Sequence, residues 1–151
     1  MVVGYTYNPN TLLVIIRGVP ITGFADGSTI NLTPNNDKYN TTYGTTGLFI
    51  RSLQVNDGGV LTFSLMPNSP SNNFLSSLLL EDALAQTAIV PFAIKARTGV
   101  LPDIASGFGW VKKAVDLNYN VGGDAPMREW TFEAAKYTQT VGGGTLPLGA
   151  V

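Results

Sequence analysis

The sequence contains no cysteine and no histidine. Their absence excludes disulfide bonds, thiolate nucleophiles, the commonest general base and most zinc or copper sites. Catalysis by carboxylates alone needs two acids that converge on one site, but the acidic residues are dispersed along the chain. The adjacent pair Glu81 and Asp82 follows an apolar run and is interpreted as the end of a solvated helical turn. We therefore expect a protein that is not an enzyme and that holds no cofactor.

Charged residues are also scarce. They make up 13% of the chain, which is about half of their usual share in a soluble domain. Hydrophobic residues make up 44%. A surface with few charges is often one that other protein surfaces cover. The composition therefore predicts a protein that forms oligomers.

The formal net charge is −1, with nine basic and ten acidic residues. The sequence lacks a run of basic residues that would bind phosphate groups tightly, so tight binding to nucleic acid is not expected. The longest apolar stretch, Leu12 to Ile16, is far shorter than the roughly 20 residues of a membrane-spanning helix. The N-terminus also lacks the pattern of a signal peptide. The sequence predicts no membrane partner and no export.

The length of 151 residues predicts a single domain over residues 1–151. Residues 1–10 show no periodicity and are interpreted as an N-terminal arm, and a tail rich in Gly and Pro is expected at about 138–151. No metal site is expected, because the acids that could bind calcium each lie beside Gly or Asn in a predicted turn. These acids are Asp26, Asp37, Asp57 and Asp124.

Alternation of apolar and polar residues predicts about seven or eight antiparallel strands. Residues 128–137 alternate cleanly, with Trp130, Phe132 and Ala134 between polar side chains. Gly107 and Gly109 interrupt another apolar stretch and predict a bend or a β-bulge. With one helix packed beside them, these strands predict a mainly β fold, either a β-barrel or a β-sandwich.

The helix is expected at about residues 71–86. Ser69 before Pro70, or a serine slightly later, offers the N-cap. On a helical projection most apolar side chains share one half of the circumference, whereas Leu80 and Leu84 lie on the opposite half. This second apolar stripe predicts a subunit interface at Leu80 and Leu84. The alternative is a helix that is buried on both sides within its own domain.

The clearest local signal in the sequence is a β-hairpin at residues 48–66, in which 48–55 is predicted to pair with 60–66 around Asn-Asp-Gly-Gly. A three-residue loop at 57–59 gathers the apolar side chains on one face, with Val55 opposite Leu61. Uncharged polar side chains then share the other face: Ser52, Gln54, Thr62 and Ser64.

The preceding residues, 34–47, are polar and contain Pro34 together with several Asn and Gly. They are expected to form a loop of about 14 residues, which is longer than most connections. A loop of this length is usually either functional or disordered.

Several segments stand out in order along most of the chain. They are Gly23–Ile30, Asn36–Tyr39 leading to Gly44–Gly47 and Arg51, Leu65–Leu75, Pro91–Phe92, Ala105–Lys112 and Arg128–Trp130. In these segments the chain resembles a tail tube or related structural protein of contractile-tailed bacteriophages. Pro67 and Asn68 depart from the polar pair expected before the Ser-Pro step, which leaves the subgroup open.

The resemblance implies a β-barrel with a flanking helix, similar to the tubes of type VI secretion and of R-type pyocins. It implies subunits that self-assemble into stacked hexameric rings, and so into a hollow tube inside a contractile sheath. DNA passes through this tube on ejection. Sheath, baseplate and tail-terminator proteins are then the expected partners in the virion, and the chain would be synthesised in the host cytoplasm.

Within such a tube, the polar hairpin face is expected to line the lumen, because a conduit for DNA should be polar without binding phosphate. Part of the long loop is expected to reach the adjacent ring: Asn36, Asp37, Lys38, Tyr39 and Tyr43. Leu80 and Leu84 are expected to close a subunit interface. The alternative function is a carbohydrate-binding or adhesin-like β-sandwich module, which would present clustered Tyr and Trp side chains on an exposed face.

Overall fold

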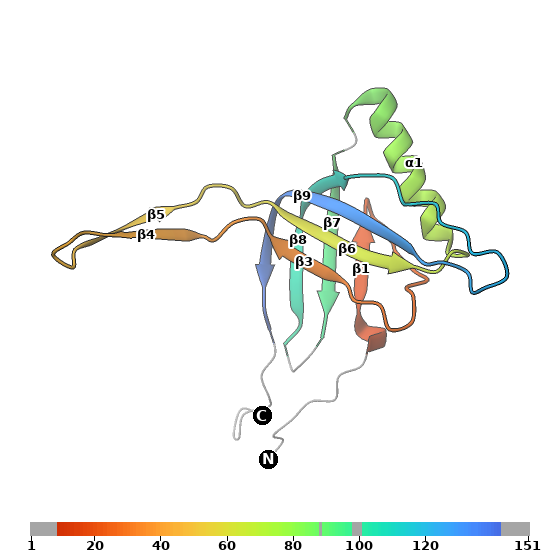
Figure 1. Ribbon diagram of the computed structural model, residues 1–151, viewed down its shortest axis with the longest axis horizontal. Coiled ribbons are helices and arrows are strands. Elements are labelled where there is room, and N and C mark those ends of the chain that lie inside the picture. The colour runs from red at the N-terminus through yellow and green to blue at the C-terminus, as the bar shows by residue number, and fades with distance from the viewer. Residues whose placement is uncertain (1–8, 88, 98–100, 143–151) are drawn as a thin grey trace, which may run out of the picture.

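The computed structural model describes residues 9–87, 89–97 and 101–142 (Figure 1). Most of the predicted N-terminal arm, residues 1–8, lies outside the described residues, as does 143–151 of the predicted tail. The first residues assigned to that tail, 138–140, instead belong to the last strand.

The described residues form nine strands and one α-helix, which confirms the prediction of a mainly β fold. Seven strands form one antiparallel sheet in the order β2-β1-β7-β8-β9-β6-β3, and β4 pairs with β5 in a separate two-stranded sheet. The large sheet is not a closed barrel, because its edge strands β2 and β3 are not hydrogen-bonded to each other. In chain order the elements are a short 3₁₀ turn Pro9–Thr11, β1 Leu13–Ile16, β2 Val19–Pro20, β3 Asn31–Pro34, β4 Tyr39–Tyr43, β5 Phe49–Leu53, β6 Gly59–Leu65, α1 Pro70–Ala85, β7 Val90–Ala96, β8 Asp103–Val111 and β9 Arg128–Thr140.

One face of the seven-stranded sheet forms the core. On β9 the predicted alternation is confirmed, since Trp130, Phe132 and Ala134 are buried. Their neighbours on β6 alternate in the same way, and the register sets Phe132 opposite Leu61 and Trp130 opposite Phe63. We call the opposite face, which carries the intervening residues of these strands, the outer face. Its side chains are half-buried or exposed in the described chain.

The helix is confirmed within one residue of its predicted ends. Ser69 is the N-cap and accepts a hydrogen bond from the backbone N–H of Ser71, and Pro70 occupies the first turn. Leu75 and Leu78 enter the same core cluster as the strands. The helix therefore covers the core side of the sheet and leaves the outer face free.

The Ser69 hydroxyl also joins the helix to a distant segment, because it donates a 2.6 Å hydrogen bond to the carbonyl oxygen of Thr22. Replacing Ser69, which is buried, with alanine removes the cap and leaves that carbonyl without its donor. We expect Ser69→Ala to lower the free energy of unfolding by about 1–2 kcal/mol. Urea unfolding followed by circular dichroism measures this change. Ser77→Ala is the matched control, since Ser77 is an exposed serine within the helix, and an equal effect in both variants would contradict the assignment.

The predicted hairpin of 48–66 is wrong. β5 pairs with β4, in the register Tyr39 with Leu53 and Tyr43 with Phe49, whereas β6 pairs with β3 and β9. Residues 34–47 are accordingly not one long loop, because they contain β4 and the tight turn that leads into β5. The reason is that the apolar face of β6 finds a much larger apolar partner in β9, and local alternation cannot distinguish between these partners.

The predicted bend at Gly107 and Gly109 is confirmed as a shift of register between Phe108 and Gly109. A Cβ atom at Gly109 would overlap the carbonyl oxygen of Glu133 on the neighbouring strand. The backbones of β8 and β9 approach each other this closely only because the side chain is absent. The two glycines predict the bulge from the sequence of β8 alone, but they do not predict which strand pairs with it.

Candidate functional site

The two-stranded sheet β4–β5 projects from the body of the molecule as an arm (Figure 1). It continues the β3–β6 pair, since the backbone N–H of Asn35 donates to Gly58 O and that of Gln54 donates to Lys38 O. The arm turns back at Gly44–Gly47, where Gly44 N–H donates to Leu48 O and Gly47 adopts a left-handed φ of +85°. Residues 39–53 therefore form one continuous hairpin that leaves the core.

The arm has two chemically different faces, because paired residues in an antiparallel ribbon lie on the same side. We call the first the aromatic face. Within it, the Tyr43 and Phe49 rings lie 6.1 Å apart, and the Arg51 guanidinium lies 4.1 Å above the centre of the Tyr39 ring. We call the second the polar face, and Ile50 is its one large apolar residue. The aromatic face consists of Tyr39, Thr41, Tyr43, Phe49, Arg51 and Leu53, and the polar face of Asn40, Thr42, Ile50 and Ser52.

The aromatic face is exposed to solvent. The exposed fractions are 73% for Tyr43, 67% for Phe49 and 55% for Leu53. A two-stranded ribbon without packing is only marginally stable in water, and contiguous exposed apolar side chains commonly mark an interaction surface. The arm therefore has the properties of a segment that is covered by another molecule.

An ion pair braces the base of the arm. Lys38 Nζ lies 2.8 Å from Asp57 Oδ1. This hydrogen bond, together with the opposite charge, raises the pKa of Lys38 above 10.5 and lowers the pKa of Asp57 below 3.8. The Asp57 contribution to stability is present above 3.8 and is lost as pH falls through the lowered pKa. The Lys38 contribution is present below 10.5 and is lost as pH rises through the raised pKa. The pair therefore persists throughout the neutral range.

The residues predicted to line a lumen do not share one hairpin. Ser52 lies on the polar face of the arm and Gln54 lies at its base, whereas Thr62 and Ser64 lie on the outer face of the large sheet. There they pair with Thr131 and Glu129 of β9, which were not expected to line the lumen. The strand pairing of β6 with β9 is what brings these polar side chains together.

The predicted inter-ring residues are divided between two kinds of structure. Asn36 and Asp37 precede the arm, Lys38 braces its base, and Tyr39 and Tyr43 lie on its aromatic face. The other aromatic and apolar members of that face, Phe49 and Leu53 among them, were missed because residues 48–55 were predicted to pair with β6. Tyr39 and Tyr43 therefore belong to the projecting arm itself, whereas Asn36, Asp37 and Lys38 lie at or before its base.

Leu80 and Leu84 are exposed on α1, with exposed fractions of 65% and 89%. Leu80 also borders a groove of about 360 Å³ between the helix and residues 114–117. Apolar residues form most of its wall: Pro67, Leu79, Leu80, Ala114, Val115, Leu117 and Trp130. The second apolar stripe of the helix is therefore outside the core of its own domain, as a subunit interface requires.

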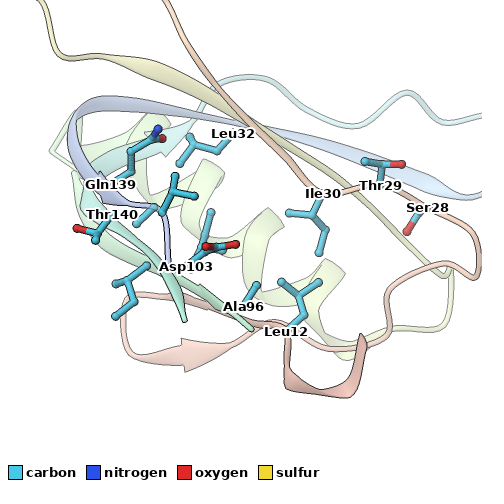
Figure 2. A pocket seen from close by; sticks show the side chains of 13 residues that line it. Leu12, Ser28, Thr29, Ile30, Leu32, Ala96, Asp103, Gln139 and Thr140 are labelled. Carbon is cyan, nitrogen blue, oxygen red and sulfur yellow. The ribbon is translucent and has the colours of Figure 1, made fainter. Parts of the chain in front are cut away.

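An open pocket of about 440 Å³ lies at the other end of the sheet, and Figure 2 shows its lining. The Asp103 carboxylate lies in the middle of the opening, with Gln139 and Thr140 on one side and Ile30 on the other. Asp103 Oδ1 accepts a 2.7 Å hydrogen bond from the backbone N–H of Gly142. It is the one acid in the lining, so the pocket does not contain the paired carboxylates of a hydrolase.

Within the described ranges, no three acidic residues come close enough together to hold a metal ion. Among the same residues, no helix is long and apolar enough to span a membrane. The candidate functional regions are therefore surfaces rather than clefts, namely the arm, the outer face and the exposed side of α1.

Comparison with family models finds no match, and no curated protein matches the sequence. Solved structures do match in fold. A chain in the cryo-EM structure of the PVC sheath/tube terminator, from an extracellular contractile injection system, has a TM-score of 0.62 at 12% identity, covering 92% of this chain and 99% of that one. The cap of the anti-feeding prophage, titled as a tube terminating cap, has a TM-score of 0.61 at 12% identity, covering 94% and 95%.

A third match is a chain of the PVC sheath-tube complex, with a TM-score of 0.59 at 11% identity, covering 90% of this chain and 92% of that one. At these identities the likeness establishes a shared fold. Because nearly the whole of each chain is matched, the fold is shared as a complete domain.

Proposed function

We propose that this chain is the structural subunit of a phage tail tube. In this proposal it self-assembles into stacked hexameric rings that form the conduit for DNA ejection, inside a contractile sheath. Its partners are further copies of itself, the sheath protein, and the baseplate and terminator proteins of the tail, and its location is the virion.

The projecting arm carries this proposal. A protein that acts alone gains nothing from an exposed aromatic ribbon, and such a surface favours aggregation. A subunit that always meets other copies can place the same ribbon against a neighbour. The shared fold with chains from contractile injection systems supports this interpretation, since those chains come from a sheath/tube terminator, a tube-terminating cap and a sheath-tube complex.

The lumen is assigned to polar, uncharged and acidic positions. Thr62 and Ser64 lie beside Glu129 on the outer face, and Ser52 and Gln54 add uncharged polar side chains near the arm. DNA would slide past such a wall without binding, because none of these side chains can neutralise phosphate. Leu80 and Leu84 are assigned to a subunit interface on the helix side.

Electron microscopy and sedimentation velocity of the purified protein test the proposal over a range of concentrations. We expect hexameric rings at low concentration and stacked tubes as the concentration rises. A strictly monomeric species at millimolar concentration would contradict the proposal. Sugar binding by such a monomer would instead support the carbohydrate-binding alternative.

A second candidate is a terminating ring that ends a tube, which is favoured by the fold match to a sheath/tube terminator and a tube-terminating cap. The same measurement separates the two functions. A tube subunit adds rings without limit, whereas a terminator stops at one ring and binds the end of a tube that another protein has formed.

A further inference from the structure

The aromatic face of the arm carries one charge, Arg51. Its guanidinium contacts the Tyr39 ring, and within the described residues it forms no ion pair. If the aromatic face is covered by another copy, as the proposed function requires, this charge loses its water. A desolvated guanidinium is strongly unfavourable without a carboxylate partner. The surface that receives the arm must therefore present an acid within an apolar setting.

Few acids of the chain meet this requirement. Asp57 and Glu81 already form ion pairs, and Asp82 and Asp103 have other contacts. Glu129 and Glu133 are the two acids on the outer face among the described residues. The remaining acids lie in exposed connections: Asp26, Asp37, Asp116 and Asp124.

Glu133 has the surroundings that Arg51 needs. It is half-buried, and its cross-strand neighbours are Val60 on β6 and Trp110 on β8, both half-buried as well. Glu129, by contrast, is exposed and pairs with the small polar Ser64. Within the described residues Glu133 forms no ion pair. It is flanked by one aromatic and one aliphatic side chain.

We propose that the aromatic face of one copy's arm packs on one end of the outer face of a second copy, with Arg51 bound to Glu133 between Trp110 and Val60. The other end of that face, at Ser64 and Glu129, stays open to the lumen. This inference rests on the proposed function and identifies the surface that receives the arm. Two β layers pack face to face at about 10 Å, a spacing that their side chains fill. Lys112 and Lys136 are exposed on the same outer face, and their long side chains can carry the ammonium groups out to water.

The contact is heterologous, since the arm and its receiving surface are different parts of the chain. A heterologous contact repeats from copy to copy until it closes into a ring or continues along an axis. One chain can therefore receive an arm and offer its own arm at the same time. This property is what a ring or stack of identical subunits needs.

Charge reversal tests the pairing. We expect Arg51→Glu and Glu133→Arg each to raise the concentration at half-assembly by about 30-fold or more, because each change leaves a buried charge beside a like charge. The double variant Arg51→Glu with Glu133→Arg is expected to recover assembly to within about fivefold of the original chain. Sedimentation velocity measures all three variants, and urea unfolding verifies that each remains folded.

Glu129→Arg is the matched control. It lies four residues from Glu133 on the same strand and face, about 13 Å away, and should leave assembly nearly unchanged. If assembly is normal in Glu133→Arg, or if Glu129→Arg rescues Arg51→Glu instead, the receiving surface is wrong while the proposed function stands. If the unmodified chain forms no oligomer at all, both are overturned.

Cysteine pairing provides a second readout, because the chain has no native thiol to compete. Thr41 lies opposite Arg51 on the aromatic face, and Thr131 lies two residues from Glu133 on the outer face. Mixing Thr41→Cys with Thr131→Cys under oxidation should produce covalent dimers. Thr42→Cys, on the polar face of the same arm, should not. Equal yields from both arm positions would overturn the assignment of faces.

Discussion

Replacing residues 39–53 with Asn-Gly is expected to leave a folded monomer that no longer assembles. The backbone N–H of Gln54 donates to Lys38 O across the cut, so a two-residue type I′ turn can close the shortened hairpin at that pair. The Lys38–Asp57 ion pair at the base is retained. No core residue is removed, because residues 39–53 are exposed.

The concentration at half-assembly is expected to rise by more than about 100-fold, because the whole contact made by the arm is deleted. Sedimentation velocity measures the oligomers, and thermal unfolding should give a melting temperature within a few degrees of the original monomer. The matched control is Asn40→Ala with Ser52→Ala, which changes only the polar face and should preserve assembly. Continued ring formation by the shortened chain would show that the arm is not the assembly element.

Phe132→Ala is expected to lower the free energy of unfolding by about 3–5 kcal/mol. The Phe132 side chain is 1% exposed, and its ring meets that of Phe92 edge to face at 5.3 Å. Its cross-strand neighbours Leu61 and Val111 are buried as well. Deleting the ring therefore leaves a cavity that rigid neighbours on both sides cannot fill.

Urea unfolding in the arm-deleted background measures this effect without a contribution from assembly. Phe108→Ala is the control, because Phe108 lies on the adjacent strand but points to the outer face and is 57% exposed. We expect its effect to stay within about 0.5 kcal/mol. Comparable losses in both variants would mean that the core does not lie on the face described.

The sequence predicts elements well where neighbouring residues determine the structure. The helix begins at a serine followed by proline, and both act within one turn of the chain. The alternation around Phe132 and the bulge near Gly109 are also local patterns. Each of these follows from backbone preferences and from one buried side, so no knowledge of the partner strand is needed.

The pairing of β5 could not be predicted in the same way. Leu53 and Val55 alternate as though they faced a core, and the intervening Asn-Asp-Gly-Gly suits a hairpin turn. In the structure these apolar residues are exposed, because β9 takes their place beside β6. β9 rather than β5 pairs with β6 because that pairing buries more apolar surface. β9 lies far from β6 in the sequence, so a short stretch of sequence around β5 does not reveal this competitor.

The candidate surfaces also differ in how far local sequence predicts them. The position of Leu80 and Leu84 on the opposite side of the helix follows from helical geometry alone, whereas their exposure is known only from the tertiary structure. The aromatic face of the arm depends on which strand pairs with β5. Arg51 and Tyr39 meet only because β4 and β5 are partners.

By itself, the sequence determined which side chains are absent or scarce and the periodicity of the strands and helix. The absence of histidine and cysteine and the scarcity of charge are properties of composition, and periodicity follows from the backbone geometry of each element. The tertiary structure alone decided that residues 39–53 leave the core as an arm with one aromatic face. It also placed Glu133 between Trp110 and Val60, because strand order depends on which distant apolar faces bury the most surface together.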